Sequence, residues 1–106
     1  MTNDSANRQH AWPAVYQGEL LPEPDPDATA PTAATLDELL KSLRRQGIPI
    51  SAPDREIHDW DGTCVTSYVR CTVGEHPVWG AGIARDRTQA MLRAVDAAAH
   101  RVAVAL

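Results

Sequence analysis

The most regular pattern of hydrophobic and polar positions lies in the last quarter of the chain. From about residue 87 to 104, apolar residues recur at the spacing of one helix face: Met91, Leu92, Ala94, Val95, Ala98, Ala99 and Val102. The opposite face is polar and carries Gln89, Arg93, Asp96 and His100. Asp86 is placed to cap the helix, and Gln89 completes the spacing of a capping box. The pattern predicts an amphipathic helix that packs by its alanine-rich side.

A second helix is predicted from about residue 36 to 46. Thr35 and Glu38 have capping-box spacing at its start. One apolar stripe follows, formed by Leu36, Leu39, Leu40 and Leu43. Gly47 is a natural stop, and Pro49 prevents the helix from continuing.

Three β-rich segments lie between the two helices, at about 55–60, 64–73 and 78–84. The turn signals Asp61-Gly62 and residues 74–77 separate them. The order helix, three antiparallel strands, helix predicts an α+β fold with the helices against one face of the sheet. Gly80 and Gly82 in the last strand are best explained by a neighbouring helix that crosses close to the strand.

Residues 1–34 differ in composition from the rest of the chain. They contain five prolines and carry one arginine against five acidic residues, a net charge of −4. Residues 35–106 carry nine basic and nine acidic side chains, so the predicted domain is neutral. We therefore expect a disordered, acidic, proline-rich tail over 1–34, with an extended and solvated linker from Leu21 to Thr32, followed by one folded domain over 35–106.

The tail contains an apolar island at residues 11–20, which includes Trp12 and Tyr16. Two interpretations stay open for it. It could dock as a short peptide on this domain or on a partner, or it could be a poorly ordered segment that happens to carry two aromatic residues.

The cysteines and histidines do not indicate catalysis. Cys64 and Cys71 both fall in the predicted central strand, about 23 Å apart along it and on opposite faces, so they cannot pair with each other. Free thiols and an N-terminus without an apolar signal core favour the cytoplasm, and no segment is apolar enough to span a membrane. The four histidines have no metal-ligand spacing, and we predict no catalytic residue, metal or cofactor.

Residues 78–101 resemble the final strand and helix of a known regulatory domain. The matching positions are Val78, Trp79, Gly80, Gly82, Ile83, Ala84, Thr88, Ala90, Leu92, Arg93, Ala94, Val95, Ala98 and Arg101. They resemble the C-terminal allosteric, leucine-sensing and dimerising domain of 2-isopropylmalate synthase. Tyr68-Val69-Arg70-Cys71 is similar to that family's Tyr-Val-Glu-Cys strand.

The resemblance implies a regulatory module without the catalytic barrel. In that family the regulatory region is a pair of strand-strand-strand-helix units, with leucine bound between the units at the dimer interface. This chain resembles the helix of the first unit and the whole second unit. Such a half should leave an open sheet edge and uncovered apolar surface, so we expect a homodimer or docking on a separately encoded synthase-type enzyme. Tyr68, Trp79 and Gly80 are the expected interface residues.

The resemblance also suggests where a small amino-acid effector would bind. Residues 54–59 align with the family's Asp-Tyr-x-Glu-His-Ala segment, with Arg55 in place of Tyr and Asp59 in place of Ala, while His58 matches. With Gly82, Ile83 and Arg87 these residues form the candidate effector site: Arg55, His58, Asp59, Gly82, Ile83 and Arg87. The charges could instead be ordinary solvated surface, and His58 could simply be satisfied by backbone groups.

Two other classes of function remain as alternatives. The element order also describes a double-stranded RNA-binding domain, and Arg85, Arg87 and Arg93 would form its basic cluster. Asp86 and Thr88 interrupt that cluster, and the neutral domain lacks the positive charge that a polyanion requires, so nucleic acid is not the expected partner. A pure protein-interaction scaffold is the other alternative.

Overall fold

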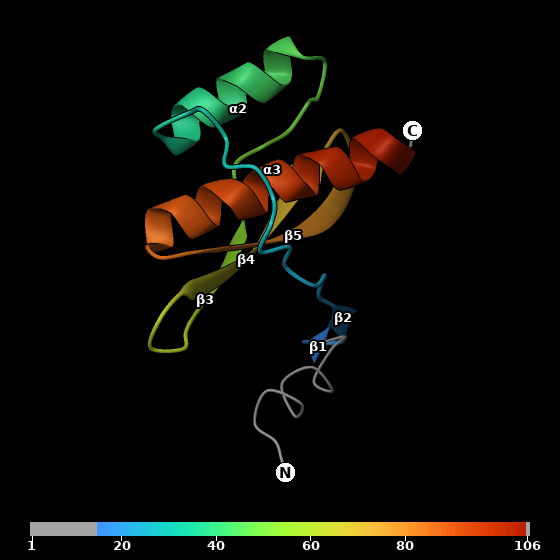
Figure 1. The fold of residues 1–106 in the computed structure, drawn as a ribbon. Helices are drawn as coiled ribbons and strands as arrows, with labels where there is room; N and C mark the ends of the chain where they lie inside the picture. The colour runs from blue at the N-terminus through green and yellow to red at the C-terminus, as the bar shows by residue number, and fades with distance from the viewer. Residues whose placement is uncertain (1–14, 106) are drawn as a thin grey trace.

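The computed structural model describes residues 15–105, and the side chains of residues 15–101. The elements follow in the order β1 (Val15–Tyr16), β2 (Glu19–Leu20), α2 (Leu36–Arg45), β3 (Arg55–Trp60), β4 (Val65–Val73), β5 (His76–Ala84) and α3 (Arg87–Ala105). The strands β3, β4 and β5 form an antiparallel sheet in that order, and α2 and α3 lie on one side of it (Figure 1). The predicted α+β fold is confirmed.

Both helices begin at the predicted caps. The backbone N–H of Glu38 donates to Thr35 Oγ1 at 3.1 Å, and the N–H of Gln89 donates to Asp86 Oδ1 at 2.8 Å. Each bond satisfies one of the N–H groups that a helix start leaves without a partner. After α2, Gly47 adopts a φ of +90°, which ends the helix at little steric cost.

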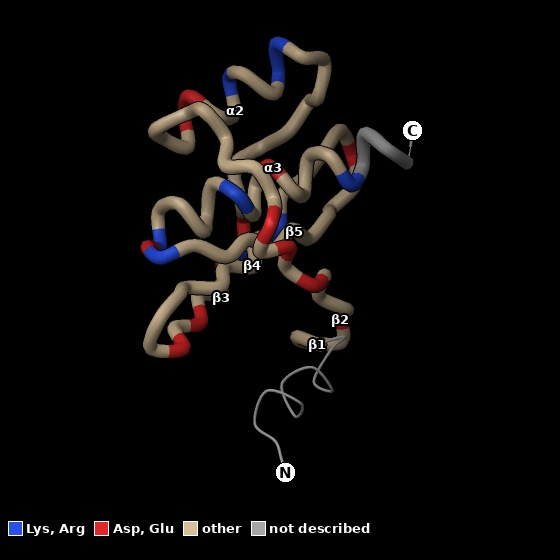
Figure 2. The backbone as a smooth tube through the Cα atoms, in the orientation of Figure 1, with Lys and Arg blue, Asp and Glu red and all other residues tan. Residues whose placement is uncertain are grey.

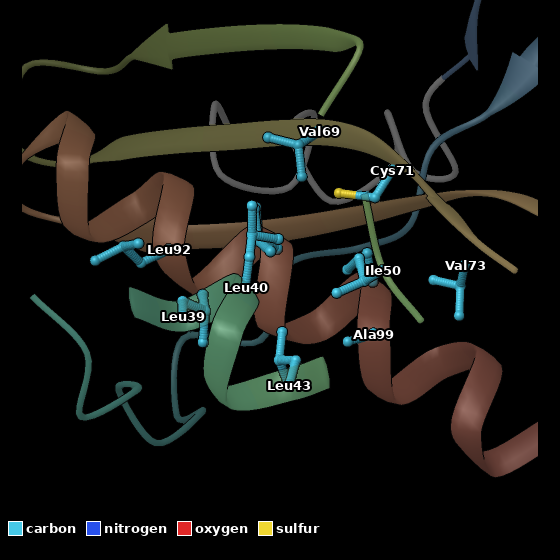
Figure 3. Packing of buried hydrophobic residues seen from close by; sticks show 12 residues of the cluster. Leu39, Leu40, Leu43, Ile50, Val69, Cys71, Val73, Leu92 and Ala99 are labelled. Carbon is cyan, nitrogen blue, oxygen red and sulfur yellow. The ribbon is translucent and has the colours of Figure 1, made fainter. Parts of the chain in front are cut away.

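The main core lies between the helices and the side of the sheet that faces them. Alternate residues of β4 point into it, and they meet leucines from α2 and the small face of α3 (Figure 3). Its buried members are Leu39, Leu40, Leu43, Ile50, Val69, Cys71, Val73, Leu92, Ala94, Val95, Ala98 and Ala99. The core is small because three of the five residues that α3 contributes are alanine.

Strand β5 and helix α3 approach each other closely at Gly80 and Gly82. A Cβ atom added at Gly80 would lie 2.5 Å from the backbone nitrogen of Ala98, and one at Gly82 would lie 2.5 Å from that of Ala94. Real Cβ atoms essentially never come so close to other heavy atoms. The helix can therefore cross the strand at this distance only where the strand has no side chain, which confirms the interpretation of the two glycines.

The N-terminal segment forms a hairpin that the sequence analysis left undecided. Gln17 and Gly18 both have positive φ, at 49° and 83°, which is the conformation of a type I′ turn between β1 and β2. Tyr16 of the hairpin packs in a cluster with Tyr68 and Trp79 of the sheet, so this part of the apolar island docks on the chain itself. Figure 1 shows where β1 and β2 lie in the chain.

The expectation of a solvated linker from Leu21 to Thr32 is wrong at its first residue. Leu21 is only 5% exposed, because it packs on the sheet together with the hairpin. The rest of the linker forms neither helix nor strand and is largely exposed. The expected disorder of residues 1–14, including Trp12, lies outside the described residues, and the division of the chain at residue 34 stays a prediction.

The crossing of β5 and α3 can be tested with a single methyl group. We predict that Gly82→Ala lowers the free energy of unfolding by about 3 kcal/mol, because helix and strand must separate to admit the methyl. Gly62→Ala is the matched control: nothing lies within 4 Å of a Cβ there, and its φ of +96° predicts a cost of only about 1 kcal/mol. Urea denaturation measures both. Equal losses in the two variants would contradict the close crossing.

Candidate functional site

The face of the sheet that points away from the helices carries the most specific contacts in the described chain. Strand register places Arg55, Ile57, Asp59, Thr66, Tyr68, Arg70, Trp79, Ala81 and Ile83 on this helix-free face. Its centre is apolar, with Tyr68, Trp79 and Ala81 buried and Ile57 partly buried. Burial, assisted by the nearby carboxylate of Asp59, raises the pKa of Tyr68 to about 12.

Residues 15–21, which we call the arm, cover this centre. The ring of Tyr16 meets Trp79 edge to face, with centroids 6.0 Å apart. Glu19 bridges two groups of the face: it accepts from Trp79 Nε1 at 3.0 Å and from an Arg70 guanidinium nitrogen at 3.3 Å. Gln17 Oε1 accepts from Arg55 at 3.0 Å. Leu21 adds a buried aliphatic side chain. The arm therefore contacts the sheet through the ring of Tyr16, the carboxylate of Glu19, the amide of Gln17 and the aliphatic side chain of Leu21.

Arg70 is oriented toward the arm by a second carboxylate. Its Nε and Nη2 atoms donate to the two oxygens of Asp54, at 3.1 and 2.8 Å, which leaves Nη1 for Glu19. This two-bond geometry fixes the plane of the guanidinium group. The hydrogen bonds from Arg70 hold the pKa of Asp54 below its usual range.

A second candidate site is the groove where the linker passes across β5 and α3. Two hollows, of about 250 and 370 Å³, lie along it, and Arg93 lines both. Arg93 donates to the carbonyl oxygen of Ala28 at 3.2 Å, while its buried Nε atom has no hydrogen-bond partner among the described residues. Asp96 lines the first hollow, and burial raises its pKa.

The groove thus holds opposite charges next to apolar walls. Arg93 and Asp96 line the first hollow together with four more ionisable residues, Glu23, Asp25, His100 and Arg101. Its apolar lining comes from Pro22, Ala28, Ala81 and Ala97. A guanidinium group and a carboxylate on one wall can hold a small zwitterion, and the alanines leave room for a short aliphatic group. Acidic residues also follow the linker along this path (Figure 2).

The six residues of the predicted effector site do not converge. Arg55, Asp59 and Ile83 belong to the helix-free face, whereas His58 and Gly82 lie on the face toward the helices. Arg87 is exposed at the start of α3. Gly82 lines the first hollow and Ile83 the second, so these two lie along the groove. The effector role of the set stays a prediction.

His58 has a different environment from both expectations. Its Nδ1 lies 2.7 Å from Ser67 Oγ, and its Nε2 lies 3.0 Å from Glu56 Oε1. The expectation that backbone groups satisfy this histidine is wrong, because neighbouring strand side chains do so. These bonds hold the ring against the sheet.

Two of the three predicted interface residues lie on the helix-free face. Tyr68 and Trp79 are both covered by the arm, whereas Gly80 lies under α3. Gln17, Glu19 and Arg70, which also build this site, were not predicted from the sequence. A Gln-Gly turn flanked by Val15-Tyr16 and Glu19-Leu20 was the signal that could have indicated the hairpin.

The described chain also limits the chemistry of the site. Among residues 15–105 no three histidine, cysteine or acidic side chains gather where they could hold a metal ion. Neither helix in this part of the chain has the length and apolarity that crossing a membrane requires. Both cysteines are free; Cys64 lies just before β4, not inside the strand as expected, and Cys71 lies within it.

Comparison with known proteins gives one relative. The chain is similar to the 2-isopropylmalate synthase of Kocuria rhizophila, with 31% identity over 78 residues. The match covers 71% of this chain but only 13% of that enzyme. No family model matches the chain, and no solved structure matches it. The comparison shows a partial relationship to this synthase, confined to a small share of its length.

The two thiols should differ sharply in reactivity. Burial, with the carboxylates of Asp54 and Glu56, raises the pKa of Cys71 to about 12, which disfavours the reactive thiolate at neutral pH. Cys64 is only partly buried and lines the second hollow. We predict that Ellman's reagent modifies one thiol per native chain quickly and the second only in guanidinium chloride.

The variant Cys64→Ser identifies the reactive thiol, because it should remove the fast reaction and keep the slow one. Fast modification of two thiols in the native chain would contradict the burial of Cys71.

Proposed function

We propose that this chain is a non-catalytic regulatory or dimerisation module that serves 2-isopropylmalate synthase and the biosynthesis of leucine and related branched-chain amino acids in the cytoplasm. The observation that carries the proposal is the 78-residue similarity to the Kocuria rhizophila synthase, which extends over 71% of this chain and 13% of the enzyme. A match to so small a share of the enzyme supports a module that regulates the synthase and does not itself carry out the reaction.

The packing of β5 and α3 supports the resemblance in the final strand and helix. The matching positions include Gly80 and Gly82 on β5 and Ala90, Ala94 and Ala98 on α3, whose backbones meet at the close crossing. A side chain at Gly80 or Gly82 would force the helix away from the strand. The matching residues are thus the ones that define this architecture.

We further propose that the groove at Arg93 holds a small amino-acid effector. The guanidinium group of Arg93 would bind the α-carboxylate, and Asp96 would bind the α-ammonium group. Ala81 and Ala97 supply apolar walls for an aliphatic side chain. In this proposal the effector is held by Arg93 and Asp96, two charged residues three positions apart on α3, instead of by the six residues predicted from the sequence, which do not converge.

The partner in this proposal is a second copy of the chain or a separately encoded synthase-type enzyme. The expected interface residues Tyr68 and Trp79 lie at the centre of the helix-free face, so association through this face requires the arm to move. The double-stranded RNA alternative is not favoured, because residues 15–34 carry four acidic residues and no basic one, and part of this segment lies beside Arg93.

Calorimetry with leucine, isoleucine and valine tests the effector proposal. We expect binding of at least one of the three, and Arg93→Gln should weaken it about tenfold or more, because a hydrogen bond to a charged group contributes about 1.5–3 kcal/mol. Arg45→Gln, an exposed position on α2, is the matched control and should leave the affinity unchanged.

Absence of heat with all three amino acids at millimolar concentration would contradict effector sensing. Equal weakening in the two arginine variants would place the effector elsewhere.

A further inference from the structure

The arm binds the helix-free face as a separate peptide ligand would, although it belongs to the same chain. Its contacts with the sheet are specific, but it has little secondary structure of its own, because β1 and β2 contain two residues each. The outer side chains of the hairpin, Val15 and Leu20, are 64% and 61% exposed. An isolated two-stranded hairpin is marginally stable in water, so the arm keeps its shape only while it lies on the sheet.

The connection between the arm and α2 permits the arm to leave. Residues 22–34 form no helix or strand, and prolines at 22, 24, 26 and 31 favour an extended backbone. The printed sequence contains no apolar residue larger than alanine or proline in this linker. Release of the arm would therefore disturb little beyond the helix-free face and the contact between Arg93 and Ala28.

The surface under the arm is self-complementary in its chemistry. The arm offers the face an aromatic ring, a carboxylate and an aliphatic side chain. The face itself carries the same three kinds of group, in Tyr68, Asp59 and Ile57, around the Trp79 and Arg70 groups that receive them. Two copies related by a two-fold axis could exchange these groups reciprocally, as an isologous interface requires.

We propose that the helix-free face is the surface through which two copies of this chain associate, and that the arm is its built-in competitor. This inference rests on the self-association in the proposed function and adds its control: in the closed chain Tyr16, Glu19 and Leu21 occupy the positions that the second copy would take. Association then begins with release of the arm.

The area of the helix-free face and the effective concentration of the tethered arm agree with control of association by the arm. Three strands of up to nine residues present a face of roughly 14 by 30 Å, or about 400 Å². That is about half of the roughly 800 Å² that each partner contributes to a standard interface, so the dimer should be weak. A segment tethered by a short linker competes at an effective concentration in the millimolar range, which suffices to suppress a weak dimer.

Sedimentation velocity on the full chain from low to high micromolar concentration tests the inference. Glu19→Lys removes both carboxylate contacts and places a cation beside Arg70. We expect it to lower the dissociation constant of the dimer at least tenfold relative to the parent chain. Glu75→Lys, at an exposed position in the turn between β4 and β5, makes the same change of charge and should behave as the parent chain. Adding Asp59→Lys to Glu19→Lys should raise the dissociation constant of the dimer again, because Asp59 is the carboxylate that each copy would offer to the other.

Hydrogen exchange on the same samples shows whether the arm was released. In Glu19→Lys, residues 15–21 should exchange faster while α3 keeps its protection, which also establishes that the variant is folded. Unchanged exchange of the arm would overturn its role as a cover. A Glu19→Lys chain that associates no more strongly than the parent chain, with its arm released, would overturn the face as the association surface.

These results are separable from those of the proposed function. Calorimetry is done on the parent chain, in which the arm and the linker are in place, so a negative result by sedimentation leaves the calorimetric test standing.

Discussion

The close crossing of α3 over β5 is the constraint on which the rest of the structure depends. Backbone meets backbone at Gly80 and Gly82, and the alanines of α3 provide the shallow surface that makes this possible. Such packing leaves little volume for large side chains, so the core gains bulk from α2, whose leucines fill the space that α3 leaves over β4 (Figure 3). Both helices are thereby committed to one face of the sheet.

The opposite face must then find its cover elsewhere. Strands β4 and β5 carry Tyr68, Trp79 and Ala81 there, and a solvent-exposed patch of this kind favours association. The arm supplies the cover from within the chain, with Glu19 joining Trp79 and Arg70. The same arrangement sends the linker across α3, which creates the groove at Arg93. One packing constraint thus leads to both candidate sites.

Periodicity and capping signals predicted the helices and strands well, because each signal depends on neighbours in sequence, as in the leucine stripe after Thr35. The glycines at 80 and 82 likewise indicated, within one short segment, where a helix crosses the strand. The sites were harder to predict. Glu19 meets Trp79 across 60 positions, and nothing local indicates that pairing. Arg93 looked like a solvated position because its helix face is polar, but the linker covers it. The effector residues assigned by resemblance lie on both faces of the sheet, because an alignment carries no information on strand faces, and their effector role stays a prediction.

The most direct test of this account is a nuclear Overhauser spectrum of the labelled full chain. The account predicts cross-peaks from the α-protons of Gly80 and Gly82 to the methyl groups of Ala94 and Ala98, and from the Trp79 indole proton to the ring of Tyr16. A spectrum with the glycine–alanine cross-peaks but none between Trp79 and Tyr16 would show an open sheet face and contradict the account.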